Sequence, residues 1–161
     1  MASPTRGAQT SETQIEVLWS ALSGDATGDS AITSYNLQWD AGTNGAQWFD
    51  ILGEEGFPSL GLTYIQVSVT AGTQYQFKVR AANALGWGQY SLPATISAAA
   101  QPDSPDAPTV TLVNVLVQIA WNAPYDNSAQ VNGYKVYVED SVGTFRLETT
   151  YCNGLIEPVK T

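Results

Sequence analysis

The strict alternation of residues 74–81 constrains the fold of this chain more than any other feature of its sequence. One set of positions is apolar or aromatic and the other is polar or cationic: Tyr75, Phe77, Val79 and Ala81 against Gln76, Lys78 and Arg80. Successive side chains of a β-strand point to opposite faces of a sheet, so this pattern predicts a strand with one buried face. Whatever else the chain does, it has to build a core against that face.

The flanking residues predict a hairpin and further strands. A turn with a glycine precedes Tyr75, a loop of small residues is expected over 83–88, and a second strand is expected from Tyr90 onward. Shorter alternating segments at 15–19, 32–39, 47–52 and 62–69 also read as strands. The side chains expected to point inward from three of them are Ile15, Val17 and Trp19; Tyr35, Leu37 and Trp39; and Ile65, Val67 and Val69. The sequence therefore predicts an all-β fold.

The stretch 69–91 resembles the end of a fibronectin type III domain. It contains, in the family's order, a turn, Tyr75, the apolar alternation, an Ala-x-Asn at 81–83 and a Gly-x-Gly-x-Tyr-Ser at 86–91. The resemblance implies an immunoglobulin-like antiparallel β-sandwich of about 100 residues, with Tyr75 closing a tyrosine corner. The core residues that it implies are Trp19, Tyr35, Trp39, Tyr75, Phe77 and Val79.

A second copy of the same module is expected to begin after a proline-containing linker. Trp121 lies 102 residues after Trp19, and Tyr134 lies 99 residues after Tyr35. We therefore expect a complete domain at 1–99, a linker at 100–107 and a partial second domain at 108–161, with Trp121 and Tyr134 in its core. Strands are expected at 109–113, 115–121 and 131–138, and the last 54 residues are about half of a sandwich. This repeat would contain strands A to C′ only.

The resemblance implies a non-catalytic structural or adhesive module from a tandem array in a large extracellular or cell-surface protein. Such a module sets the distance between neighbouring domains and contacts protein partners or adjacent repeats. Two alternatives stay open: a carbohydrate-binding or receptor-type recognition module, and an intracellular or ciliary scaffold repeat. The incomplete second repeat leaves a strand edge open, and strands from another chain are one way to complete it.

Charge and composition narrow the classes of partner. The chain has 6 Lys and Arg against 15 Asp and Glu, for a formal net charge of -9. Nucleic acid is excluded as a partner because its phosphates bind clustered cations. No apolar run approaches the roughly 20 residues of a membrane-spanning helix, so no membrane insertion is expected. The first ten residues have no apolar core and do not read as a secretory signal.

The candidate interaction residues are aromatic. Residues 87–91 are similar to the Trp-Ser-x-Trp-Ser box of cytokine-receptor fibronectin domains, in which the Trp stacks on cations of the neighbouring strand; here Lys78 and Arg80 are available. That similarity implies a structural stack at Trp87. The alternative is that Trp87 contacts a ligand from its loop, with Trp48 and Trp87 as the platform of a recognition module. Tyr90 is a further candidate interaction residue.

The remaining candidates are weaker. Cys152 is the single cysteine, so a disulfide would need a partner outside the 161 residues, and a lone thiol without a role is the other interpretation. No histidine is present to act as a base for a catalytic thiol. We expect no cofactor and no firm metal site. The only weak calcium candidates are the loop carboxylates Asp25, Asp29, Asp103 and Asp106.

Overall fold

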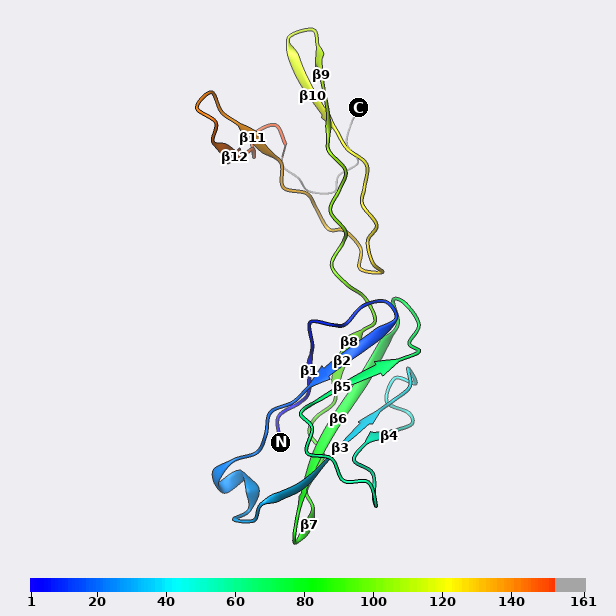
Figure 1. Ribbon diagram of the computed structural model, residues 1–161. Helices are drawn as coiled ribbons and strands as arrows, with labels where there is room; N and C mark the ends of the chain where they lie inside the picture. Colours follow the sequence, from blue (N-terminus) through cyan, green and yellow to red (C-terminus); the bar gives the residue numbers. More distant parts are fainter. Residues whose placement is uncertain (153–161) are drawn as a thin grey trace. The chain divides into compact units, whose positions relative to one another are not determined.

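The computed structural model describes residues 1–152, and nearly all of its regular structure is β-strand (Figure 1). The chain divides into two compact units, Met1–Ala129 and Gln130–Thr161. The strands of the first unit are β1 (Thr5–Arg6), β2 (Gln14–Leu18), β3 (Ile32–Trp39), β4 (Phe49–Leu52), β5 (Thr63–Val67), β6 (Gln74–Asn83), β7 (Gly86–Trp87), β8 (Ala94–Ser97), β9 (Thr109–Val113) and β10 (Leu116–Ala120). A short 3₁₀ turn, η1, spans Gly24–Thr27. The second unit contains β11 (Tyr137–Glu139) and β12 (Phe145–Leu147).

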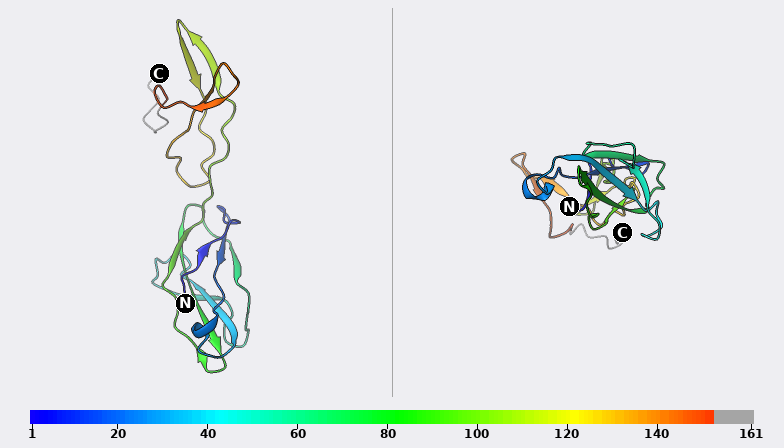
Figure 2. Two further views of the ribbon diagram at one scale, coloured as in Figure 1. Left: turned by 90° about the vertical axis from the view of Figure 1, so that its left-hand side faces the viewer. Right: turned by 90° about the horizontal axis from the view of Figure 1, so that it is seen from below.

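Residues 1–99 form two antiparallel sheets that face each other (Figures 1 and 2). One sheet has the order β1-β2-β5. The other has the order β4-β3-β6-β7, and β8 pairs with the first half of β6. This arrangement is the predicted antiparallel sandwich, and β6 is the long central strand of its larger sheet.

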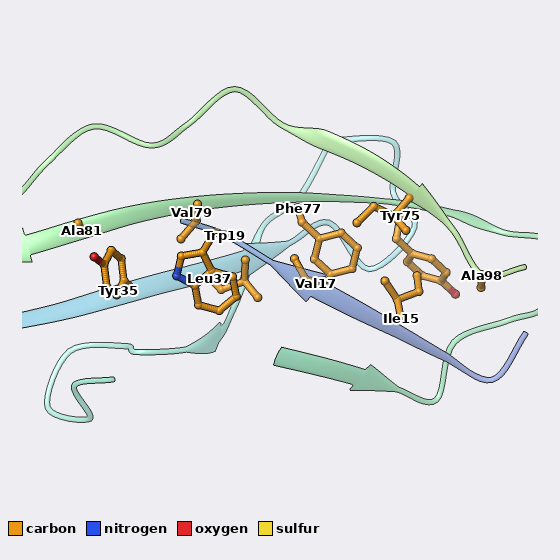
Figure 3. Close-up of a cluster of buried hydrophobic side chains, with 11 residues drawn as sticks. Ile15, Val17, Trp19, Tyr35, Leu37, Tyr75, Phe77, Val79, Ala81 and Ala98 are labelled. Carbon is orange, nitrogen blue, oxygen red and sulfur yellow. The ribbon is translucent and has the colours of Figure 1, made fainter. Parts of the chain in front are cut away.

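The core lies between the two sheets (Figure 3). Strands β2, β3 and β6 each contribute every second residue, because alternate side chains of a strand point to the same face. The buried cluster consists of Ile15, Val17, Trp19, Tyr35, Leu37, Tyr75, Phe77, Val79, Ala81, Ile96 and Ala98, and Trp39 packs against it while partly exposed. Each of the larger side chains removes enough apolar area to contribute about 1.5–3 kcal/mol to folding.

Two tyrosines fasten loops to this core through their hydroxyl groups. The Tyr75 hydroxyl accepts a hydrogen bond from the Thr70 backbone N–H at 2.8 Å, which closes the tyrosine corner that the family resemblance implies. The Tyr35 hydroxyl accepts one from the Leu22 N–H at 3.0 Å, in the loop before η1. Both rings are buried, so each hydroxyl needs its partner.

The side chains of β5 point to the opposite faces of the sheet from those expected from sequence. Ile65 and Val67 were expected to point inward, but they are 37% and 56% exposed. The antiparallel register places Tyr64 opposite Val17, and Tyr64 packs on the core instead. Ser68 has a φ of 60°, which ends the strand and changes the phase, so Val69 alone of the expected three packs on the core.

The hairpin after β6 is tighter than expected. The residues 83–88 were expected to form a loop, but Ala82 pairs with Trp87 and Asn83 pairs with Gly86. Trp87 therefore lies on a strand. The expected strand from Tyr90 begins only at Ala94. Between the two strands, the Gly88 and Ser91 N–H groups each donate one bond at 2.8 Å to a β6 carbonyl, and the Ser91 Oγ accepts a bond from the Val79 N–H at 3.1 Å.

The strands beyond residue 108 pair as the first strands of the sandwich do. β9 pairs with β10 as β1 does with β2, and β11 pairs with β12 as β3 does with β4. The expected strand at 109–113 is confirmed by β9. The strand expected at 131–138 is wrong for residues 131–136, because β11 begins only at Tyr137.

The expected core of the second repeat is not buried. Val117 is 63% exposed, and Trp121 and Tyr134 are only partly buried. Within residues 1–152 no third strand joins either hairpin, so their apolar faces lack the cover that β5, β6 and β8 give to the first sandwich.

Candidate interaction site

The side chains that point away from the core along β3 and β6 form the candidate site. Their register places Asn36 opposite Arg80 and Gln38 opposite Lys78. Side chains directly opposite each other in an antiparallel pair lie close enough to interact. The alternation that sends Phe77 and Val79 into the core therefore also sends Lys78 and Arg80 to one outer face.

Three aromatic rings and two cations alternate on this face, and we call this set the ladder: Trp48, Lys78, Tyr90, Arg80 and Trp87. The Lys78 Nζ lies 3.9 Å from the ring centre of Trp48 and 4.6 Å from that of Tyr90. The Arg80 guanidinium carbon lies 4.5 Å from the ring centre of Tyr90 and 4.6 Å from that of Trp87. Each cation thus contacts two rings, and each such contact stabilises by about 0.5–2 kcal/mol.

A fully buried asparagine anchors the ladder to the sheet. The Asn36 Oδ1 accepts hydrogen bonds from the Arg80 Nε at 3.1 Å and from the Tyr90 hydroxyl. The Asn36 Nδ2 donates to the Asp50 Oδ1 at 2.7 Å and to the Leu52 carbonyl at 3.1 Å. These bonds fix the positions of Arg80 and Tyr90, and they use all the ordinary hydrogen-bonding capacity of the amide.

The electrostatic environment of the ladder changes two pKa values. Burial lowers the pKa of Lys78, the neighbouring Arg80 charge lowers it further, and Asp50 acts in the opposite direction. Burial raises the pKa of Tyr90 more than the nearby Arg80 charge lowers it. Tyr90 is therefore a neutral hydrogen-bond donor at neutral pH, which is the form that Asn36 requires.

The structure brings together all three predicted interaction residues, Trp48, Trp87 and Tyr90. Trp87 stacks on Arg80, as the similarity to the cytokine-receptor box implies. Lys78 contacts the rings of Trp48 and Tyr90 and not that of Trp87. A cation therefore lies over the ring of each tryptophan, Lys78 over Trp48 and Arg80 over Trp87. This arrangement favours the structural interpretation of Trp87 over a free stacking platform.

The weak calcium candidates do not assemble into a site. In the described part of the chain, no group of three or more carboxylate, histidine or cysteine side chains could hold a metal ion. Asp25 and Asp29 lie in and after η1, and the Asp103 Oδ1 accepts a bond from the Asn127 Nδ2 at 2.9 Å. Cys152 is a partly buried thiol that forms no disulfide among the described residues. No helix among residues 1–152 is long and apolar enough to cross a membrane.

Sequence reasoning missed the polar residues that support the site. Asn36 and Asp50 carried a usable signal, because both residue types are disfavoured inside strands. Asp40 is fully buried, and its carboxylate accepts bonds from the N–H groups of Gly42, Gly45 and Gln76 at 2.8–3.0 Å. Its sequence position after Trp39, before a glycine-containing turn, suggests a turn residue but not its bond to β6.

The sandwich and its tyrosine corner define an immunoglobulin-like module, and comparison with known proteins identifies its kind. Residues 3–97 match the family model of the fibronectin type III domain, so the chain belongs to the fibronectin type III domain family. Members of this family are commonly structural or protein-interaction modules and are generally non-catalytic.

The chain is also similar to individual proteins and solved domains. The chain is 33% identical over 87 residues to fibronectin type-III domain-containing protein 3a of Gallus gallus, a match that covers 53% of this chain and 7% of that protein. The fourth fibronectin type III domain of a human protein superposes with a TM-score of 0.50 at 16% identity, covering 58% of this chain and 72% of that one. The sixth fibronectin type III domain of human fibronectin type III domain containing protein 3 gives 0.48 at 22% identity, covering 64% and 89%.

Proposed function

We propose that the chain is a non-catalytic spacing and protein-interaction module from a tandem fibronectin type III array. The observation that carries this proposal is a fully packed sandwich followed by strands that pair in the same order. The domain at 1–99, the linker at 100–107 and the partial domain at 108–161 are the proposed units of the array. Strands supplied by the rest of the array, or by another chain, complete the second unit.

The ladder supports a spacing role. A module that carries load or fixes distance benefits from a rigid sheet. Five side chains joined by ring and cation contacts tie β6 and β7 to the segments around Trp48 and Tyr90, and the hydrogen bonds of Asn36 join β3 to them. In this proposal the protein lies outside the cell or on its surface, and Cys152 pairs with a cysteine beyond residue 161.

Two experiments on the endogenous protein separate this proposal from its alternatives. Surface biotinylation of intact cells is expected to label the protein, and labelling only after permeabilisation would support the intracellular or ciliary scaffold. Purified protein is expected to show no saturable signal on a glycan array. Glycan binding that Trp87→Ala abolishes would replace the spacer by a carbohydrate-recognition module.

A further inference from the structure

An apolar groove lies at one end of the sandwich, between the loop that contains η1 and the β6–β7 hairpin. Its volume is about 310 Å³, and its walls include Leu22, Ile32, Ala81, Leu85 and Trp87. Figure 1 places η1 and β7 at this same end of the sandwich. The Asn83 Nδ2 donates to the Thr27 carbonyl at 2.9 Å, which holds the two walls together.

The groove is bordered by a leucine that folding leaves uncovered. Leu85 occupies the two-residue turn between β6 and β7 and is 87% exposed. Turn positions ordinarily carry glycine or short polar residues, so a leucine there gains nothing for the turn itself. A groove of this volume is at the small end of ligand sites, which are roughly 300–1,000 Å³, and it suits one or two large side chains.

Two aspartates adjoin the residues that line the groove. No charged residue lines it, but Asp25 and Asp29 flank its lining residues Ala26 and Gly28. The nearest cation in sequence, Arg80, is held by Trp87, Tyr90 and Asn36.

We propose that this groove binds a basic, extended segment of a partner protein, in which one aliphatic or aromatic side chain is flanked by Lys or Arg. The apolar side chain enters the groove beside Leu85 and Trp87, and the flanking cations approach the carboxylates of Asp25 and Asp29. Charge complementarity selects this partner chemistry, because the carboxylates of Asp25 and Asp29 beside the groove attract Lys or Arg and repel an acidic segment. The inference rests on the proposed interaction function and names the partner class of that function.

Titration of the isotope-labelled full chain with the peptide acetyl-Arg-Leu-Arg-Leu-Arg-amide tests the assignment by NMR. We expect saturable shifts of residues 22–32 and 81–88, with a dissociation constant on the order of 0.1–1 mM. Affinity is expected to fall as NaCl rises, because exposed charge pairs are screened. The peptide acetyl-Glu-Leu-Glu-Leu-Glu-amide is the matched probe and is expected to leave these residues unshifted.

Paired variants separate the groove from general attraction to an acidic protein. Leu85→Ser is expected to weaken binding about fivefold or more, whereas Leu92→Ser, at another exposed leucine, is expected to leave it unchanged. Asp25→Asn is expected to weaken binding about two- to fivefold, and Asp106→Asn in the linker segment is its control. All four positions are exposed, so the variants keep the parent fold, which the same spectra check.

Two outcomes would overturn the assignment. One is a lack of saturation by the basic peptide, and the other is equal loss of binding in Leu85→Ser and Leu92→Ser. Either result leaves the spacing and interaction function standing, because cell-surface labelling and the expected lack of glycan binding test that function independently of this groove.

Discussion

The guanidinium of Arg80 lies 4.6 Å from the ring centre of Trp87, and the same group lies 4.5 Å from the ring centre of Tyr90. Arg80 is therefore the point at which β6, β7 and the segment after β7 are joined on the outer face of the sheet. Its Nε also donates to Asn36 on β3. Several consequences of this arrangement can be measured.

Arg80→Met removes the cation but keeps most of the apolar stem. We expect the free energy of unfolding to fall by about 1–3 kcal/mol, because two ring contacts and one charged hydrogen bond are lost. Urea denaturation followed by tryptophan fluorescence measures this change. Lys135→Met, at an exposed lysine, is the control and is expected to change stability by less than about 0.5 kcal/mol.

A double-mutant cycle assigns the contact between Arg80 and Trp87 directly. With Arg80→Met, Trp87→Leu and the double variant, we expect a coupling free energy of about 0.5–2 kcal/mol. Additive losses within about 0.3 kcal/mol would mean that the two side chains contribute independently.

Two substitutions of Trp19 are expected to differ strongly in their effect on stability. Its ring is buried, yet within residues 1–152 its Nε1 has no hydrogen-bond partner. Trp19→Ala is expected to cost about 3–5 kcal/mol because it leaves a cavity. Trp19→Phe also loses side-chain volume, but it removes the unpaired donor, and this gain offsets part of the loss. We therefore expect the free energy of unfolding to fall by only about 1 kcal/mol. Calorimetric melting curves of both variants measure the difference, and equal losses would show that the donor is satisfied in solution.

Removal of the Tyr75 hydroxyl tests the tyrosine corner. Tyr75→Phe leaves the Thr70 N–H without its 2.8 Å acceptor, and we expect a loss of about 1–3 kcal/mol. Tyr64→Phe is the matched control, since the Tyr64 ring packs on the same core and its hydroxyl makes no hydrogen bond among the described residues. Its expected loss is below about 0.5 kcal/mol.

Stability at alkaline pH is expected to depend on Tyr90. Its raised pKa means that the folded state holds the phenolic proton more tightly than the unfolded state does. This contribution is complete below the ordinary tyrosine pKa of about 10 and is lost as the pH rises through the higher folded value. The stability advantage of the parent over Tyr90→Phe should therefore shrink as the pH rises above about 10 and through the raised folded-state pKa. Denaturation at a series of pH values measures it, and a constant difference would contradict the raised pKa.

Much of the fold follows from local pattern. The alternation at 74–81 places Phe77 and Val79 in the core and Lys78 and Arg80 outside, and any antiparallel sheet would preserve that division. The same rule correctly places Ile15, Val17, Tyr35 and Leu37 inside. It fails for Ile65 and Val67, because both faces of β5 carry apolar residues, and only the register with β2 decides which face is buried.

The sequence by itself therefore determined an all-β sandwich of the fibronectin type III kind, most of its core, and the presence of outward aromatic and cationic side chains. Only the tertiary structure decided which cation meets which ring, that Asn36 and Asp50 support them, and that the η1 loop and the β6–β7 hairpin enclose an apolar groove. The physical reason is the separation in sequence of the residues involved. Alternation is set by neighbouring residues, whereas these contacts join positions as far apart in sequence as Asn36 and Arg80 or Thr27 and Asn83. Their geometry exists only when the strands are paired in one register.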